Sequence, residues 1–155
     1  MYCVVDSSFI ASLYLPDEAK SDEGSAKFAV LAREIAKDGA TAPGIWQYEM
    51  ANLLIMAERR RRITSAVQKQ ILLALDDLPI TLQPYLTHQQ RNEVMHLAQK
   101  HQLTAYDAAY LELSLRLNLP LATIDGQLVR AVTAEGGAAL EPLHAGTHGA
   151  LGENQ

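Results

Sequence analysis

Apolar and polar residues alternate along the chain in a pattern that switches between short strand-like runs and longer helical segments. The strand-like runs are residues 2–5 (YCVV), 39–42 (GATA, the weakest), 79–83 (PITLQ), 120–124 (PLATI) and 138–142 (AALEP). Apolar positions at helical spacing lie between them, in residues 7–14, 22–37, 44–62, 65–78, 88–101, 104–117 and 126–135. The alternation predicts βαβ units, and so a three-layer α/β/α sandwich with a mostly parallel central sheet.

The length of 155 residues is typical of one domain. The composition, 48% hydrophobic and 20% charged, is sufficient for a packed core. The last residues, HAGTHGALGENQ, lose the apolar periodicity. We therefore expect one domain over residues 1–143 and a flexible tail over residues 144–155.

The sequence start, MYCVVDSS, lacks the basic and apolar regions of a signal peptide, and no apolar run reaches the roughly 18 residues of a membrane span. These features predict a cytoplasmic protein without membrane contact. A single cysteine, Cys3, excludes a disulfide framework and a cysteine-rich zinc site, and we expect it to be a small core residue. The net charge of -5 argues against a broad nucleic-acid-binding surface but allows a local basic patch.

Two carboxylates lie where apolar residues are expected. Glu49 falls within the apolar arc of the helix that contains Trp46, and Asp107 lies in a helix, LTAYDAAYLELS, that is apolar on all sides. A carboxylate facing a core must be paired, protonated, bound to a metal or placed at the rim of a cleft. For Asp107 a structural alternative is open, because Thr104-x-x-Asp107 matches a capping box.

Two more carboxylates follow strand-like runs. Asp6 ends YCVV and Asp125 ends PLATI, each where a strand gives way to a helix. Each could be an Asx turn or a helix N-cap. In parallel α/β sheets, however, ligands bind beyond the carboxyl ends of the strands, so the two aspartates point to one edge. Four carboxylates there would repel one another unless a cation compensated them, and an all-oxygen set suits Mg²⁺ or Mn²⁺.

Four segments resemble the PIN-domain family, especially the VapC-type toxins of prokaryotic toxin-antitoxin pairs. They are VVDSSFIASLYLPDE, WQYEMANLL, LTAYDAAYLELS and LATIDGQLVRA, in the family's order and spacing from residue 2 to about residue 142. The resemblance implies a PIN-like fold and an acidic cluster of Asp6, Glu49, Asp107 and Asp125. It also implies Ser8 and Thr123 as supporting polar residues.

The activity implied by the resemblance is metal-dependent hydrolysis of RNA phosphodiester bonds, as the toxin of a type II toxin-antitoxin pair. One or two Mg²⁺ or Mn²⁺ ions would be held by Asp6, Asp107 and Asp125, with Glu49 either a further ligand or the base that positions the water. The implied partners are an RNA substrate, a small cognate antitoxin and a second copy of the chain in a homodimer.

Arg60 and Arg61, in the run AERRRR, are the candidate substrate-binding residues, because they fall nearer the apolar arc than their neighbours. A structural alternative is that basic residues in the last turn complement the helix dipole.

Two other functions are compatible with the residues. One is a noncatalytic module whose carboxylates anchor an arginine of another protein. The other is a Mg²⁺-dependent phosphoryl-transfer domain of receiver type, which the absence of a D-x-D pair at Asp6 makes the weaker alternative.

Overall fold

The structure is a computed structural model that describes residues 1–15 and 22–140. Within these residues the strands are β1 (Cys3–Val5), β2 (Ala40–Pro43), β3 (Ile80–Gln83), β4 (Leu121–Ala122) and β5 (Ala139–Leu140). The helices are α1 (Ser7–Tyr14), α2 (Asp22–Asp38), α3 (Trp46–Arg59), α4 (Ser65–Asp76), α5 (His88–His101), α6 (Ala105–Leu117) and α7 (Gly126–Ala134). The predicted tail at 144–155 and the end of the last strand-like run at 141–142 lie outside the described residues.

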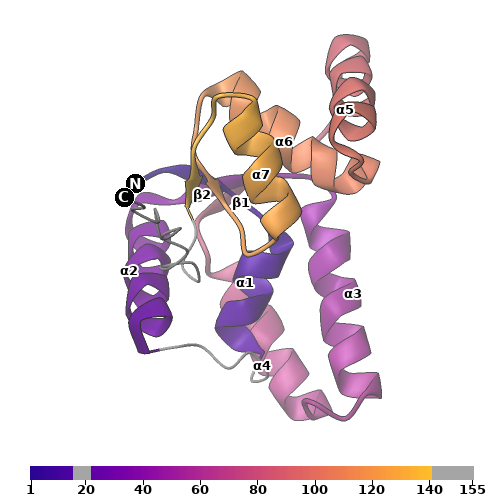
Figure 1. The fold of residues 1–155 in the computed structure, drawn as a ribbon. Coiled ribbons are helices and arrows are strands. Elements are labelled where there is room, and N and C mark those ends of the chain that lie inside the picture. Colours follow the sequence, from indigo (N-terminus) through magenta and orange to yellow (C-terminus); the bar gives the residue numbers. More distant parts are fainter. Residues whose placement is uncertain (16–21, 141–155) are drawn as a thin grey trace, which may run out of the picture.

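The strands form one sheet in the order β3-β2-β1-β4-β5, and every pair is parallel. In the view of Figure 1, α1 to α4 lie below the sheet and α5 to α7 lie above it. This arrangement follows from right-handed crossovers, because the chain first winds from β1 towards β3 and then returns towards β5 on the opposite face. The predicted α/β sandwich with a parallel sheet is confirmed.

The winding direction reverses between β1 and β4, which are neighbours in the sheet. Helices therefore leave the carboxyl ends of these two strands towards opposite faces, and a crevice opens between them. Asp6 follows β1 directly, and Asp125 follows β4 by three residues. The topology thus brings residues from the two ends of the sequence to one point on the sheet edge.

Helix α6 is the central helix of the upper layer and contacts β1, β2 and β4. The fully buried residues Tyr110, Leu111 and Leu113 fill the space between this helix and the sheet. Burial of so many large side chains explains why the helix is apolar on all sides. Cys3 is also buried, and burial raises the pKa of its thiol to about 11, so it is an unreactive core residue.

Helix α3 ends earlier than its sequence predicts. It stops at Arg59 because Arg61 adopts a left-handed backbone conformation with a φ of 59°. The amide of Arg61 donates to the carbonyl of Glu58 at 2.8 Å, and that of Arg62 donates to Ala57 at 2.9 Å. These two hydrogen bonds form a Schellman motif, in which glycine is the usual left-handed residue. An arginine there costs roughly 1 kcal/mol.

Candidate active site

Asp6 is the most enclosed carboxylate at the sheet edge, with 4% of its surface exposed. Its amide donates to the carbonyl of Ala122 at 2.9 Å and so extends the pairing of β1 with β4. Its Oδ2 accepts hydrogen bonds from Ser8 at 2.5 Å and Thr123 at 2.8 Å, and its Oδ1 accepts one from Ser7 at 3.3 Å. Burial raises its pKa, whereas the Ser8 and Thr123 hydroxyls oppose the increase. The three hydroxyl donors fix the carboxylate in one orientation.

Thr123 links the two acidic strand ends. Its hydroxyl donates to Asp6 and also accepts the amide of Asp125 at 3.0 Å. Asp125 in turn accepts the amide of Gln127 at 2.8 Å, so its carboxylate caps α7 as the N-cap alternative predicts. Asp6 precedes α1 in the equivalent position, but its side chain makes no capping hydrogen bond. Its donors are hydroxyl groups instead.

Glu49 reaches the same edge from the first turn of α3. The hydroxyl of Tyr110, on α6, donates to its Oε1 at 2.5 Å. Burial raises the pKa of Glu49, the negative charges of Asp6 and Asp107 raise it further, and the Tyr110 hydrogen bond opposes the increase. The pKa of Tyr110 is also raised, by burial and then by Glu49, so the phenol keeps its proton and remains a donor.

Asp107 lies in the first turn of α6, half-buried. Its amide donates to the Thr104 hydroxyl at 3.1 Å, which is one half of the capping box that the sequence suggests. Its carboxylate lines the cleft described below. Burial raises the pKa of this carboxyl, the Thr104 hydroxyl opposes the increase, and the charge of Asp125 adds to it. The cap of α6 is made by the amide of Asp107, and its carboxylate, which Thr104 also influences, lines the cleft.

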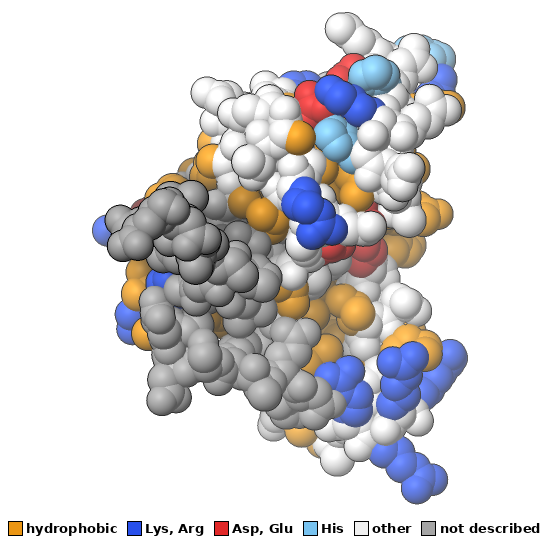
Figure 2. Space-filling view, in the orientation of Figure 1, with side chains coloured by type: hydrophobic (Ala, Val, Ile, Leu, Met, Phe, Trp, Pro, Cys, Tyr) orange, Lys and Arg blue, Asp and Glu red, His pale blue; other side chains and the backbone are white. Residues whose placement is uncertain are grey.

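All four acids line one cleft of about 310 Å³ between α1, α3 and the ends of β1 and β4. Its other lining residues are Ser7, Ser8, Ala11, Ser12, Leu15, Leu53, Arg62 and Ile124. Acidic side chains gather towards the right of the face in Figure 2, with Lys and Arg side chains above and below them. The structure thus brings Asp6, Glu49, Asp107, Asp125 and Ser8 together, with Thr123 buried behind them.

The electrostatics of the cleft favour a bound cation. Burial raises the pKa values of three of its carboxyl groups, and the charge of another acid in the cleft adds to each increase. A divalent cation would remove that repulsion, and the available donors are all oxygen atoms. In the part of the chain that the structure describes, no three His, Cys, Asp or Glu side chains are placed to hold an ion by themselves. Mg²⁺ commonly takes one or two carboxylates and completes its shell with water, so the donor set fits this ion.

The basic run after α3 is placed differently from the sequence expectation. Arg60 and Arg61 are exposed and are not among the residues that line the cleft, whereas Arg62 lines it. Helical angular positions no longer apply after Arg59, because the chain reverses at Arg61. That Arg62 lines the cleft, and Arg60 and Arg61 do not, could be recognised only from the structure.

Two other residues contribute to the site but were not predicted from the sequence. Ser7 donates to Asp6, and Tyr110 donates to Glu49. A signal for Tyr110 existed, because it lies three residues after Asp107 and therefore on the same face of α6. Its partner on α3 is 61 residues away in the sequence, so the contact itself could not be read from the pattern.

Comparison with curated proteins places the chain among known nucleases. No family model matches it. It is 31% identical to ribonuclease VapC3 of Pyrobaculum aerophilum over 134 residues, which cover 86% of this chain and 97% of the relative. The chain belongs to the VapC ribonuclease family. A second VapC relative, ribonuclease VapC1 of Mycobacterium tuberculosis, is 28% identical over 130 residues, or 83% of this chain and 90% of the relative.

Solved structures agree with the VapC assignment at the level of the fold. PAE2754 from Pyrobaculum aerophilum matches with a TM-score of 0.63 and 22% identity, over 90% of this chain and 83% of that one. FitAcB from Neisseria gonorrhoeae matches with a TM-score of 0.63 and 12% identity, over 92% and 98%. The VapC-family chain therefore has the PIN-type α/β sandwich that its sequence predicts.

Proposed function

We propose that this chain is a Mg²⁺- or Mn²⁺-dependent endoribonuclease, a hydrolase of RNA phosphodiester bonds that acts as the toxin of a toxin-antitoxin pair. The observation that carries the proposal is the convergence of four carboxylates in one cleft at the sheet's switch point. Its relatives VapC3 and VapC1 are named ribonucleases. Both the residues and the family support hydrolysis of a phosphodiester.

The metal would be held by Asp6, Asp107 and Asp125, either directly or through bound water molecules. When bound, a divalent ion lowers the pKa of a coordinated water and neutralises charge on the phosphate. Asp6 is suited to a ligand role because Ser7, Ser8 and Thr123 fix its orientation. Asp125 holds the start of α7 with one carboxylate oxygen, so the position of the acid is tied to the fold.

Glu49 is the proposed proton acceptor. Tyr110 donates to its Oε1, which orients the carboxylate in the cleft that it lines. Its raised pKa makes it a stronger base than an ordinary glutamate. The residue would take a proton from the attacking water while the neighbouring aspartates hold the cation.

The proposal is tested by incubating purified protein with a labelled single-stranded RNA and Mg²⁺ or Mn²⁺, then with excess chelator. Internal cleavage that needs the ion and returns when it is restored supports the proposal. Intact RNA under every metal condition would contradict it. In that case, Mn²⁺ titration calorimetry separates an inert protein-binding module, which binds no ion, from a different metal enzyme. A receiver-type role is disfavoured because Asp6 is buried and already accepts three hydroxyl groups.

We propose a small antitoxin protein as the inhibitor of the cleft and the cytoplasm, where its RNA substrates are made, as the site of action. Among the described residues, none of the helices is long and apolar enough to cross a membrane. The apolar rim of the cleft, formed by Ala11, Leu15, Leu53 and Ile124, would give a protein inhibitor more than charge to bind. Co-purification with the product of the neighbouring reading frame, with loss of nuclease activity, is the expected result.

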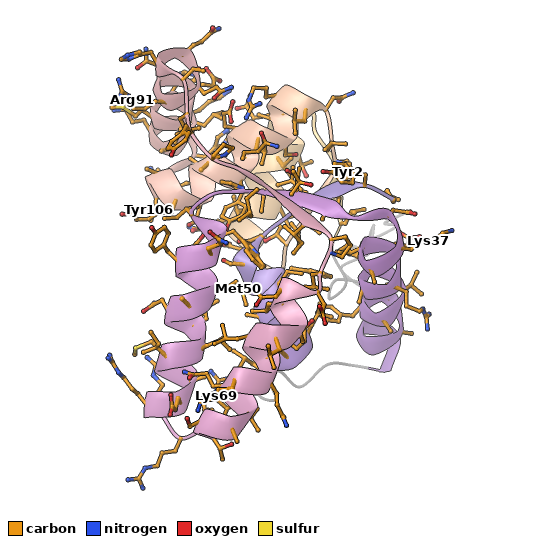
Figure 3. All side chains as sticks on the ribbon, turned by 180° about the vertical axis from the view of Figure 1, so that it is seen from behind. Tyr2, Lys37, Met50, Lys69, Arg91 and Tyr106 are labelled. Atoms are coloured by element: carbon orange, nitrogen blue, oxygen red, sulfur yellow. The ribbon has the colours of Figure 1, made fainter. Side chains whose placement is uncertain are left out.

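We also propose that the chain forms a homodimer through a larger groove of about 840 Å³ between α3, α5, α6 and the segment after β3. Five large apolar side chains on its rim are strongly exposed: Tyr48, Tyr85, Leu86, Met95 and Tyr106. Figure 3 shows Tyr106 and Arg91, another lining residue, on the same edge of the molecule. These five side chains expose on the order of 600 Å² to solvent, close to the ~800 Å² that each partner buries in a stable interface.

A second copy suits this groove because a two-fold interface needs both a projection and a hollow on the same surface. Tyr85, 90% exposed, is the projection, and the groove is the hollow. Light scattering should give a dimer for the wild type and a monomer for Tyr85→Glu combined with Met95→Glu. An unchanged dimer mass for that variant would place the homodimer interface elsewhere. A wild-type chain that is monomeric alone and binds an antitoxin, with binding lost in the variant, would assign the groove to the antitoxin.

A further inference from the structure

The cleft has a cationic side chain at its end farther from the acids. Arg62 lines the cleft together with Ala11, Leu15 and Leu53, beyond the last turn of α3. Glu49 lies in the first turn of the same helix, and Arg59, ten positions later, is about 15 Å away along the helix axis at the usual rise. The cleft therefore extends along α3 from the carboxylates to an arginine.

The unusual end of α3 places Arg62 there. Arg61 occupies the left-handed position that usually belongs to glycine, and Ile63 is buried directly afterwards. Arg62, between them, is returned towards the cleft, although a regular continuation of α3 would carry it onward along the helix axis. A strained backbone that re-aims one side chain into a cleft is a feature found at functional sites.

A second arginine, Arg130 on α7, lies near the start of that helix, which follows Asp125. Arg130 is exposed on α7, and its Nη1 is 3.3 Å from the point where a Cβ on Gly126 would lie. Its guanidinium is thus folded against the first residue of α7, next to Asp125 of the cleft.

This arrangement addresses a difficulty that the acids create for the substrate. A chain with a net charge of -5 and four acids in its cleft repels a polyanion. Metal ions held by the acids would compensate only the phosphate that is cleaved. The phosphates before and after it also need cationic partners, and arginine binds phosphate oxygens through two parallel hydrogen bonds.

We propose that Arg62 and Arg130 are substrate-positioning residues that hold two phosphates of one RNA strand on opposite sides of the scissile bond. The strand then crosses the carboxylates from the start of α7 to the end of α3, which requires it to be single-stranded in the cleft. This inference rests on the proposed ribonuclease function. In this proposal the arginines that contact the substrate are Arg62, which follows α3, and Arg130, on α7. They take the place of Arg60 and Arg61, which the sequence suggested.

The test compares Arg62→Gln and Arg130→Gln with Arg59→Gln, a matched control at the exposed end of α3, on a single-stranded RNA long enough to span the cleft. Each of the first two variants is expected to raise KM about fivefold or more while kcat is largely retained, because the lost contacts bind phosphates that do not react. Binding of RNA to the corresponding Asp107→Asn double variants should show a salt dependence weaker by about 0.7 in log-log slope for each arginine removed. Arg62→Lys and Arg130→Lys should restore the slope.

These measurements distinguish a failure of the arginine roles from a failure of the ribonuclease function on which they rest. If the wild type does not cleave RNA, the proposed function fails. If the wild type cleaves RNA but Arg62→Gln and Arg130→Gln match Arg59→Gln in KM and in salt slope, the ribonuclease assignment stands and the arginine pair is wrong. Circular dichroism melts of the same variants identify any loss that is due to unfolding.

Discussion

Thr123 donates its hydroxyl to the carboxylate of Asp6 at 2.8 Å across 117 residues of sequence. Both residues are buried at the carboxyl ends of neighbouring strands. The same hydroxyl accepts the amide of Asp125, so one side chain fixes two of the four acids relative to each other. The geometry of the acidic cleft is therefore set by the sheet itself.

Replacing Thr123 by valine keeps the shape of the side chain but removes this donor. We expect the pKa of Asp6 to rise further and metal-dependent cleavage to fall, because the ionised carboxylate loses a partner. The fold should lose about 1–3 kcal/mol of stability, the usual cost of an unsatisfied buried polar group. Urea unfolding and cleavage assays measure the two effects. Thr123→Ser keeps the hydroxyl and should behave like the wild type, so equal defects in both variants would contradict the explanation.

Tyr110→Phe removes the hydroxyl that donates to Glu49 but keeps the buried ring. The pKa of Glu49 should then increase, because the hydrogen bond that opposes the increase is lost. If Glu49 is the proton acceptor, the acidic limb of the pH-rate profile moves to higher pH by up to about one unit, the equivalent of ~1.4 kcal/mol. The exposed Tyr106→Phe is the matched control. An unmoved acidic limb in Tyr110→Phe would exclude Glu49 as the base.

Stability in the absence of metal should fall as the pH rises. Asp6, Glu49 and Asp107 have raised pKa values in the folded protein, so the folded state binds protons more readily than the unfolded state. The stability that this proton binding contributes is fully present below the pKa values of the unfolded chain, about 4. It is lost as the pH rises through the pKa values of the folded protein. Thermal melts with chelator should show this loss, and Mg²⁺ should restore stability at pH 7 through preferential binding to the folded state.

Asp107→Asn should raise the melting temperature in chelator, because it removes one of the mutually repelling charges. The gain should disappear or reverse when Mg²⁺ is present, since only the wild type then gains the full stabilisation of the ion. Scanning calorimetry with and without Mg²⁺ measures both differences. A variant less stable than the wild type in chelator would show that Asp107 is structural.

Much of the fold could be predicted from the sequence because its elements are locally determined. The helices over Ser7–Tyr14 and His88–His101 coincide with the predicted spans, and Thr87 caps the second with a capping box. The weak run GATA forms a strand because it pairs with strands on both sides and is fully buried. Tertiary burial, not local propensity, decides that element.

The acids could be located from the sequence because each is a carboxylate where an apolar residue or a strand end is expected. The resemblance also implied Ser8 and Thr123 as supporting residues, and both donate to Asp6. The contact of Glu49 with Tyr110 joins residues 61 apart in the sequence and could not be predicted from it. The position of Arg62 depends on one left-handed residue, Arg61, and nothing in a run of four arginines marks it as the place where the helix ends.

We propose that the carboxylate of Asp107 serves metal-dependent RNA cleavage and not only the cap of α6. The cap uses its amide, which Asp107→Asn preserves. The most direct measurement is the rate of RNA cleavage in Mg²⁺ by Asp107→Asn beside Asp76→Asn, an exposed control on α4. We predict a loss of about a hundredfold or more for Asp107→Asn with an unchanged circular dichroism spectrum, and wild-type activity for the control. Cleavage by Asp107→Asn at the wild-type rate would show that this carboxylate has no part in the reaction.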